Sequence, residues 1–193
     1  MSTKDMLIEN LVFKGINFNK NKIGKGTYED CTFVNCVFNG SDVSGIIFVS
    51  CLFDQCDLSL MNTSGTAFRE VKFKGCKMLG IHFEECNLFL LAMYFNNCQM
   101  NLSSFYKLKL KKTIFRNCSL QEVDFAEADL TSAIFDNCDL SGAMFERTVL
   151  EKADLSTAYN YTLDPETNRI KKAKFSQAGL GGLLGKYDIL IER

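Results

Sequence analysis

The residues of this chain with the most reactive side chains are nine cysteines and a single histidine. The pairs Cys31/Cys36 and Cys51/Cys56 have four residues between their members, which is not the short spacing of zinc sites. An odd number of cysteines, with no secretory signal apparent, favours reduced thiols over a disulfide framework. We therefore expect buried thiols that act as small apolar residues, and no metal or other cofactor.

No catalytic pattern surrounds the histidine. His82 stands between Ile81 and Phe83, and nothing in the sequence suggests a triad, so we expect a solvated surface side chain. The phosphate-binding and nucleophile patterns G-x-x-x-x-G-K-[ST], G-x-G-x-x-G and G-x-S-x-G are absent. The sequence therefore predicts a protein that is not an enzyme.

Composition excludes several further classes of protein. The chain has 193 residues, 47% of them apolar, so it can bury a core and is not generally disordered. Its net charge of −1 predicts no direct binding to nucleic acid. Its longest apolar run, Leu88–Phe95, is too short to span a membrane. We expect a cytoplasmic protein without membrane contact.

The elements that hold these side chains follow a period of five residues. Large apolar residues occupy every fifth position from Phe13 to Leu88, except at Thr63, and again from Phe95 to Leu155 after a slip of two residues. A helix would repeat apolar residues at i, i+3, i+4 and i+7, and a half-buried strand would alternate by two. Neither pattern fits, so the sequence predicts a solenoid of internal repeats.

A second inward position lies two residues before each large residue. It is mostly small, and all nine cysteines occupy it. An Asp or Asn often stands between the two positions, as in Ala128, Asp129 and Leu130. The unit is therefore small, polar and large, followed by two polar or small residues. Two side chains of each unit point inward and three point outward.

This unit resembles the repeat of the pentapeptide-repeat family, whose pattern is Ala/Cys, Asp/Asn, Leu/Phe and two variable residues. The resemblance covers residues 11–157. It implies an all-β fold, a right-handed quadrilateral β-helix with four units in each coil of 20 residues. On this basis residues 1–157 form the β-helix, and residues 158–193 hold a loop, a last partial coil and a C-terminal capping and dimerisation helix.

A coil of 20 residues fits the recurrence of Phe every ten residues in the second block of repeats. Side chains 20 positions apart would stack in columns, fill the narrow interior and leave no cavity for a substrate. The expected core-stacking residues are Phe95, Phe105, Phe115, Phe125, Phe135 and Phe145.

Three segments depart from the pattern, and we expect loops there. They are Asn21–Gly26, Met61–Thr66 and the slip within Phe89–Tyr94. The slip segment is apolar. It either exposes some of these side chains or tucks them into the core through a distorted corner. The candidate partner-binding residues of this loop are Phe89, Leu90, Leu91, Met93 and Tyr94.

The C-terminal segment is expected to cover the open end of the solenoid. Ser176 is the predicted N-cap of a short helix, and residues 188–192 are a predicted short strand. This layout is similar to the C-terminus of the Qnr-type pentapeptide-repeat proteins, in which the helix forms a homodimer. The resemblance implies a dimer interface of Leu180, Leu183, Leu184, Tyr187, Ile189 and Ile191.

The resemblance to Qnr-type proteins also implies a function. Those proteins bind the bacterial type II topoisomerases, DNA gyrase and topoisomerase IV, partly as mimics of duplex DNA, and protect them from quinolone-type inhibitors. The alternative is a structural or adaptor solenoid that binds another protein and has no topoisomerase role.

Charge is distributed in blocks along the chain. Residues 107–116 hold five positive charges, whereas residues 117–157 hold nine acidic residues against Arg147 and Lys152. A coil of 20 residues places the acids on all four faces, which predicts an acidic collar. The candidate acidic residues are Glu122, Asp124, Glu127, Asp129, Asp136, Asp139, Glu151 and Asp154.

Overall fold

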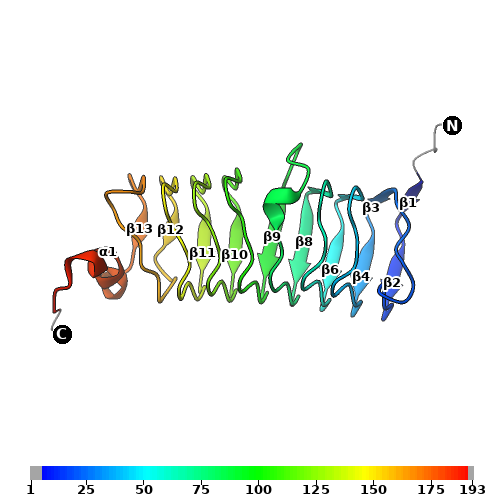
Figure 1. Cartoon of the computed structure of the whole chain (residues 1–193), viewed down its shortest axis with the longest axis horizontal. Helices are drawn as coiled ribbons and strands as arrows, with labels where there is room; N and C mark the ends of the chain where they lie inside the picture. Colours follow the sequence, from blue (N-terminus) through cyan, green and yellow to red (C-terminus); the bar gives the residue numbers. More distant parts are fainter. Residues whose placement is uncertain (1–5, 191–193) are drawn as a thin grey trace. The chain divides into compact units, whose positions relative to one another are not determined.

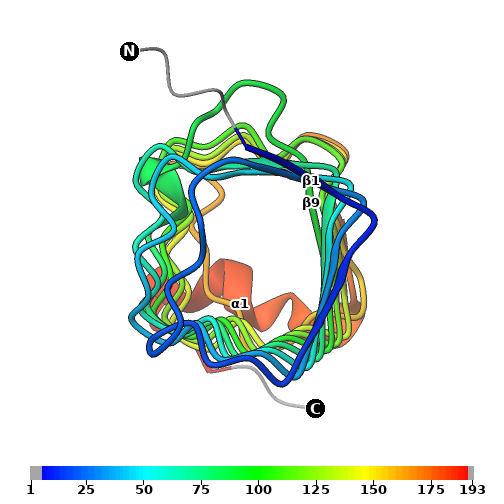
Figure 2. The same ribbon diagram turned by 90° about the vertical axis from the view of Figure 1, so that its right-hand side faces the viewer.

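Short parallel strands are the main regular element of the structure, a computed structural model that describes residues 6–190. The chain divides into two compact units, Met1–Gln99 and Met100–Arg193. In each unit the strands stack side by side (Figure 1), and the coils are four-sided when viewed end-on (Figure 2). The predicted all-β solenoid with a short C-terminal helix is therefore confirmed.

The first unit contains two parallel sheets. β1, β3, β5 and β7 pair on one side, and β2, β4, β6, β8 and β9 pair on another. Partner residues lie 20 positions apart up to β8, as with Phe33 and Phe53. The elements are β1 (Leu7–Glu9), β2 (Val12–Lys14), β3 (Thr27–Glu29), β4 (Thr32–Val34), β5 (Ile47–Val49), β6 (Leu52–Asp54), β7 (Ala67–Arg69), β8 (Val71–Lys74), the 3-10 turn η1 (Phe83–Glu85) and β9 (Met93–Asn96).

The second unit repeats this arrangement and adds the C-terminal helix. Its strands pair in parallel with the same offset, which places Phe115 opposite Phe135 and Leu155 opposite Phe175. Single bridges such as Asp129 with Val149 connect the coils on other sides. The elements are β10 (Ile114–Arg116), β11 (Ile134–Asp136), β12 (Asp154–Leu155), β13 (Lys174–Phe175), the 3-10 turns η2 (Gln177–Gly179) and η3 (Gly185–Tyr187), and the helix α1 (Gly181–Leu184).

Local hydrogen bonds explain the five-residue unit. The chain turns a corner after each large inward residue, and Lys112 and Ser132 adopt a left-handed backbone there, with φ of 61° and 59°. The preceding Asp closes the turn: Asp129 Oδ1 accepts a hydrogen bond from the Thr131 backbone N–H at 3.1 Å. Asp and Asn side chains favour this geometry, which is the physical reason that they recur between the two inward positions.

Stacked aromatic rings fill the interior of both units. In the first unit, Phe73 stacks on Phe53 and on Phe95 at centroid distances of 5.2 and 5.3 Å. In the second unit, Phe125 stacks on Phe105 and on Phe145, each at 5.4 Å. A neighbouring column places Phe115 on Phe135 at 5.1 Å. Rings of adjacent columns meet edge-on, an arrangement that aromatic pairs prefer.

One expected loop is part of a regular solenoid coil instead. In Met61–Thr66, Thr63 is 1% exposed and takes the inward position because its hydroxyl donates to the His82 carbonyl at 2.8 Å. The expected loop between Leu155 and Ala173 contains no strand, yet Tyr159 and Arg169 in it bridge the preceding coil, and Leu163 is buried. The interior therefore accepts a residue that departs from the pattern when that residue satisfies its own polar group. No strand forms within Asn21–Gly26, yet its Ile23 is buried.

The C-terminal cap is a short helical segment. Ser176 caps it as predicted, because its Oγ accepts from the Gly179 N–H at 3.1 Å. The segment packs on the last coil, where Leu163 N–H donates to the Gly182 carbonyl at 3.0 Å. A side chain at Gly182 would collide with Tyr161, so this contact needs glycine. The predicted strand over residues 188–192 is wrong for its described part, because residues 188–190 form no strand.

Replacement of Phe125 by Ala is expected to destabilise the protein strongly. The ring is fully buried and stacked on both sides, so its loss should lower the free energy of unfolding by about 3–5 kcal/mol. Urea denaturation followed by circular dichroism measures this change. Phe89→Ala is the matched control, because that ring is 64% exposed; we expect a loss of at most about 1 kcal/mol. Equal losses in the two variants would contradict the assignment of the core.

Candidate functional site

An exposed apolar loop, defined here as Leu88–Leu91, precedes β9 in the first unit (Figure 1). It arises from the two-residue slip, since β8 and β9 pair with Val71 opposite Met93, an offset of 22 rather than 20 positions. Leu88, Phe89 and Leu90 are 56%, 64% and 63% exposed. The period of five places Leu88 inward, and this expectation is wrong because the extra residues begin there. Of the two alternatives for this segment, exposure is the correct one.

The apolar loop is held in a defined conformation. The Phe89 N–H donates to Asn87 Oδ1 at 2.9 Å, and the Ala92 N–H donates to the Phe68 carbonyl at 3.0 Å. The guanidinium of Arg69 lies over the Phe89 ring, 5.4 Å from its centroid. Such a cation–π contact contributes about 0.5–1 kcal/mol at an exposed site. The apolar side chains are therefore presented to solvent by a structured segment.

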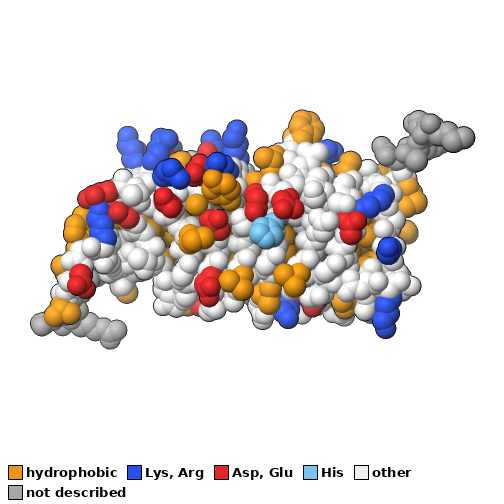
Figure 3. All heavy atoms as spheres, in the orientation of Figure 1, with side chains coloured by type: hydrophobic (Ala, Val, Ile, Leu, Met, Phe, Trp, Pro, Cys, Tyr) orange, Lys and Arg blue, Asp and Glu red, His pale blue; other side chains and the backbone are white. Residues whose placement is uncertain are grey.

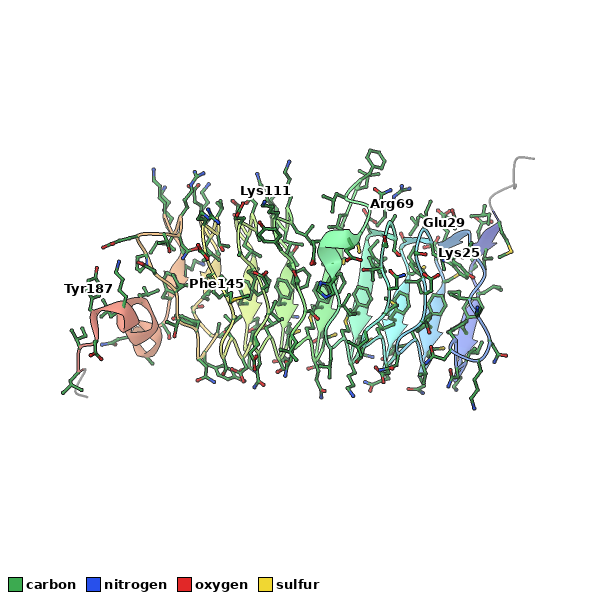
Figure 4. The ribbon with its side chains drawn as sticks, in the orientation of Figure 1. Lys25, Glu29, Arg69, Lys111, Phe145 and Tyr187 are labelled. Atoms are coloured by element: carbon green, nitrogen blue, oxygen red, sulfur yellow. The ribbon has the colours of Figure 1, made fainter. Side chains whose placement is uncertain are left out.

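A groove lies beside the apolar loop. Arg69, labelled in Figure 4, contributes to its wall, and the Arg69 Nε is buried without a hydrogen-bond partner among the described residues. The lining residues are Val49, Arg69, Glu70, Leu90, Leu91 and Ala92.

The other residues of the predicted partner-binding loop lie in different surroundings. Leu91 is half-buried in the wall of the groove, and Tyr94 is 41% exposed on β9. Met93 is 2% exposed, because β9 turns this side chain into the core. It cannot contact a partner, so its inclusion in the loop surface is wrong.

Five of the eight carboxylates of the predicted acidic collar form ion pairs among the described residues. Glu127 pairs with both Lys107 and Arg147, at 3.6 and 3.0 Å. Asp124 accepts a hydrogen bond from the Ala126 N–H at 2.8 Å, whereas Glu122 is exposed. The other ion pairs of the candidate residues are Lys111–Asp129, Arg116–Asp136, Arg169–Glu151 and Lys174–Asp154, at 3.2, 2.9, 2.6 and 3.1 Å.

These ion pairs join residues about one coil apart. The position of a charged residue in the sequence therefore does not show which charges lie next to it in the fold. Arg169 and Lys174 lie outside the acidic block of the sequence, yet they neutralise Glu151 and Asp154 on the neighbouring coil. The predicted acidic collar therefore carries less uncompensated negative charge than its sequence suggests. Most of these carboxylates are compensated within the second unit.

Apolar side chains are also exposed at the C-terminal end. Among the predicted dimer residues, Leu180, Tyr187 and Ile189 are 46%, 53% and 53% exposed, whereas Leu183 and Leu184 are half-buried. Ile191 lies outside the described residues. Leu190, not among those predicted, is 98% exposed.

The nine cysteines are buried free thiols. Burial raises the pKa of Cys51 and Cys86 to about 12, so both are uncharged at neutral pH and poorly nucleophilic. Their thiols bond locally: Cys56 Sγ donates to the Phe33 carbonyl and Cys138 Sγ to the Phe115 carbonyl, each at 3.3 Å. Cysteine therefore suits the small inward position because it can donate a weak hydrogen bond to the preceding coil.

The described residues contain no cluster of three or more His, Cys, Asp or Glu that could hold a metal ion. His82 is exposed, with its Nδ1 2.9 Å from Glu84 Oε1. Within residues 6–190, no helix is long and apolar enough to cross a membrane.

Family comparison agrees with the repeat geometry. The sequence matches the family described as Pentapeptide repeat region over residues 26–93 and again over residues 90–158. The chain belongs to the pentapeptide-repeat family. A search of curated proteins found no match.

Solved structures of other pentapeptide-repeat proteins are similar to this chain. QnrB1, a plasmid-mediated fluoroquinolone resistance protein, in a trypsin-treated variant form, is 22% identical over 97% of this chain and 100% of its own, with a TM-score of 0.49. HetL, involved in heterocyst differentiation regulation in the cyanobacterium Nostoc, is 14% identical over 91% and 88% of the two chains, with a TM-score of 0.41. A thylakoid-lumen protein of Arabidopsis thaliana is 21% identical over 63% and 70%, with a TM-score of 0.21.

The hydrogen bonds of one repeat aspartate predict acid-dependent stability. Burial alone would raise the pKa of Asp139, but hydrogen bonds from Gln121, Ser141 and Asn160 outweigh burial and lower this pKa to about 2. Because the folded-state pKa lies below the ordinary value of 3.8, the ionised side chain stabilises the folded state above that pH. This stabilisation is lost as the pH falls towards the folded-state pKa.

Asp139→Asn should therefore be less stable than the wild type near neutral pH, with a difference that shrinks between about pH 4 and pH 2. Urea unfolding at a series of pH values measures it. Glu122→Gln, which removes one exposed charge from the same unit, is the control for net charge. A difference between wild type and Asp139→Asn that stays constant down to about pH 2 would contradict the prediction.

Proposed function

We propose that this chain is a non-catalytic protein-binding solenoid whose main contact is the apolar loop Leu88–Leu91. The observation that carries the proposal is the exposure of Leu88, Phe89 and Leu90 beside a groove that Arg69 and Leu91 help to line. Exposed apolar side chains that are adjacent to one another are a feature of protein interaction sites. Aromatic anchors such as Phe89 contribute most when a partner buries them.

We further propose a bacterial type II topoisomerase as the partner, with protection from quinolone-type inhibitors as the outcome. Support comes from the resemblance of the repeats and the C-terminal segment to Qnr-type proteins. Mimicry of duplex DNA is not what carries this proposal, because Glu127, Asp129 and Glu151 are paired with cations. An adaptor solenoid with another protein partner is the competing function.

A supercoiling assay with purified DNA gyrase and a quinolone tests the proposal. The wild-type protein is expected to restore supercoiling in a dose-dependent manner. The double variant Phe89→Ser/Leu90→Ser should require at least about tenfold more protein, because burial of each large side chain contributes about 1.5–3 kcal/mol. Leu102→Ser/Met144→Ser is the control, since these side chains are also exposed, at 62% and 53%, but lie outside the apolar loop.

Two outcomes of this assay would count against the proposal. If the folded wild-type protein has no effect on gyrase or on topoisomerase IV, the topoisomerase function is wrong and the adaptor function is favoured. If the loop variant protects as well as the wild type, the apolar loop is not the contact.

We also propose that the C-terminal end forms a homodimer, because Leu180, Tyr187, Ile189 and Leu190 expose apolar surface there. Sedimentation equilibrium is expected to give twice the chain mass for the wild type and the monomer mass for Ile189→Asp/Leu190→Asp. Leu102→Asp/Met144→Asp is the control and should remain dimeric. A monomeric wild-type protein at micromolar concentration would overturn this part of the proposal.

A further inference from the structure

Lysine side chains gather along one corner of the second unit. We define the basic ridge as the stacked corner turns 111–112, 131–132, 151–152 and 171–172, with the flanking Lys109, Arg169 and Lys174. Backbone hydrogen bonds fix the stacking: Lys112 N–H donates to the Thr131 carbonyl and Lys152 N–H to the Lys171 carbonyl, each at 3.0 Å. Figure 3 shows Lys and Arg side chains along this edge, where Lys111 is labelled in Figure 4.

The basic ridge carries more positive charge than its neighbours neutralise. Three half-buried carboxylates lie beside it, with 25–29% of each side chain exposed, and each pairs with a cation whose side chain is 60–70% exposed. Those pairs are Lys111–Asp129, Arg169–Glu151 and Lys174–Asp154. Five further lysines make no ion pair within residues 6–190; they are Lys109, Lys112, Lys152, Lys171 and Lys172.

The composition of the corner turns limits the classes of partner that the basic ridge can bind. They contain Lys, Thr, Ser and a single Glu, with no apolar side chain. A protein interface needs apolar side chains at its centre, and membrane association of this kind needs apolar residues that insert. Single-stranded nucleic acid is bound through aromatic side chains that stack on bases, and the turns have none. A row of cations alone fits a regular line of phosphates.

We propose that the basic ridge binds the phosphate backbone of duplex nucleic acid without reading its bases. Coils separated by about 4.8 Å place Lys112 and Lys172 about 14 Å apart. Duplex DNA carries one charge per about 1.7 Å of its axis, or about eight phosphates over this length. The net charge of −1 predicted no such binding. That total includes acidic residues on other sides of the coils, so it does not describe the charge of the basic ridge. The proposal does not depend on the apolar loop.

Fluorescence anisotropy of a labelled DNA duplex of about 20 base pairs, titrated with the full-length protein from about 50 to 200 mM salt, tests the basic ridge. Five phosphate contacts predict a slope of log K against log salt of about −4.5. The variant Lys112→Gln/Lys152→Gln/Lys172→Gln should reduce the slope by about 3 and weaken binding at least tenfold at low salt. The matched control is Lys20→Gln/Lys22→Gln/Lys77→Gln, which removes the same charge from exposed lysines of the first unit.

The control variant should keep the wild-type affinity and slope. Equal losses in the two triple variants would overturn the proposal, as would tighter binding to polyglutamate or to phosphatidylserine vesicles than to the duplex. The loop variant Phe89→Ser/Leu90→Ser should bind the duplex normally. Duplex binding by a wild-type protein that does not protect gyrase would support the basic ridge and contradict only the topoisomerase function, whereas protection without duplex binding would overturn only the basic ridge.

Discussion

The interior of each unit is filled by stacked side chains from successive coils, and this packing depends on coils that repeat in the same register. Phe53, Phe73 and Phe95 stack at 5.2–5.3 Å, a distance close to the spacing of hydrogen-bonded strands, about 4.8 Å. Ring packing and backbone pairing therefore reinforce each other. A coil of different length would have to break one or the other unless its extra residues left the wall of the solenoid.

The apolar loop is the consequence of that constraint in the first unit. Two additional residues separate β8 from β9, while Phe73 still stacks on Phe95. The core keeps its register because Leu88, Phe89 and Leu90 are placed outside it. Leu and Phe fill the core in the other coils, but in the apolar loop they form an exposed surface. The same packing leaves no room for a substrate among the rings, so function is expected on the outer surface.

In the second unit, the stacking of the coils decides which charged residues are neighbours, and their order in the sequence does not. Residues about 20 positions apart become neighbours, so Asp129 meets Lys111 and Glu151 meets Arg169. Surface ion pairs of this kind contribute little to stability, about 0–1 kcal/mol each. Their larger effect is to neutralise most of the acidic block and to leave, within residues 6–190, lysines without an ion pair on one corner. A chain whose net charge is close to zero can therefore have a strongly positive region on its surface.

The amino-acid sequence was sufficient to predict the solenoid, the length of its coil, the inward positions and the place of the slip. The period of five indicates which side chains face inward, and it identified Phe125 and Phe135 as core residues. Three other features are visible only in the folded chain: Leu88 leaves the core, Met93 enters it, and lysines of separate coils form a ridge beside neutralised acids. The physical reason is that exposure and charge pairing depend on contacts between coils, which linear spacing predicts only where every coil has the same length.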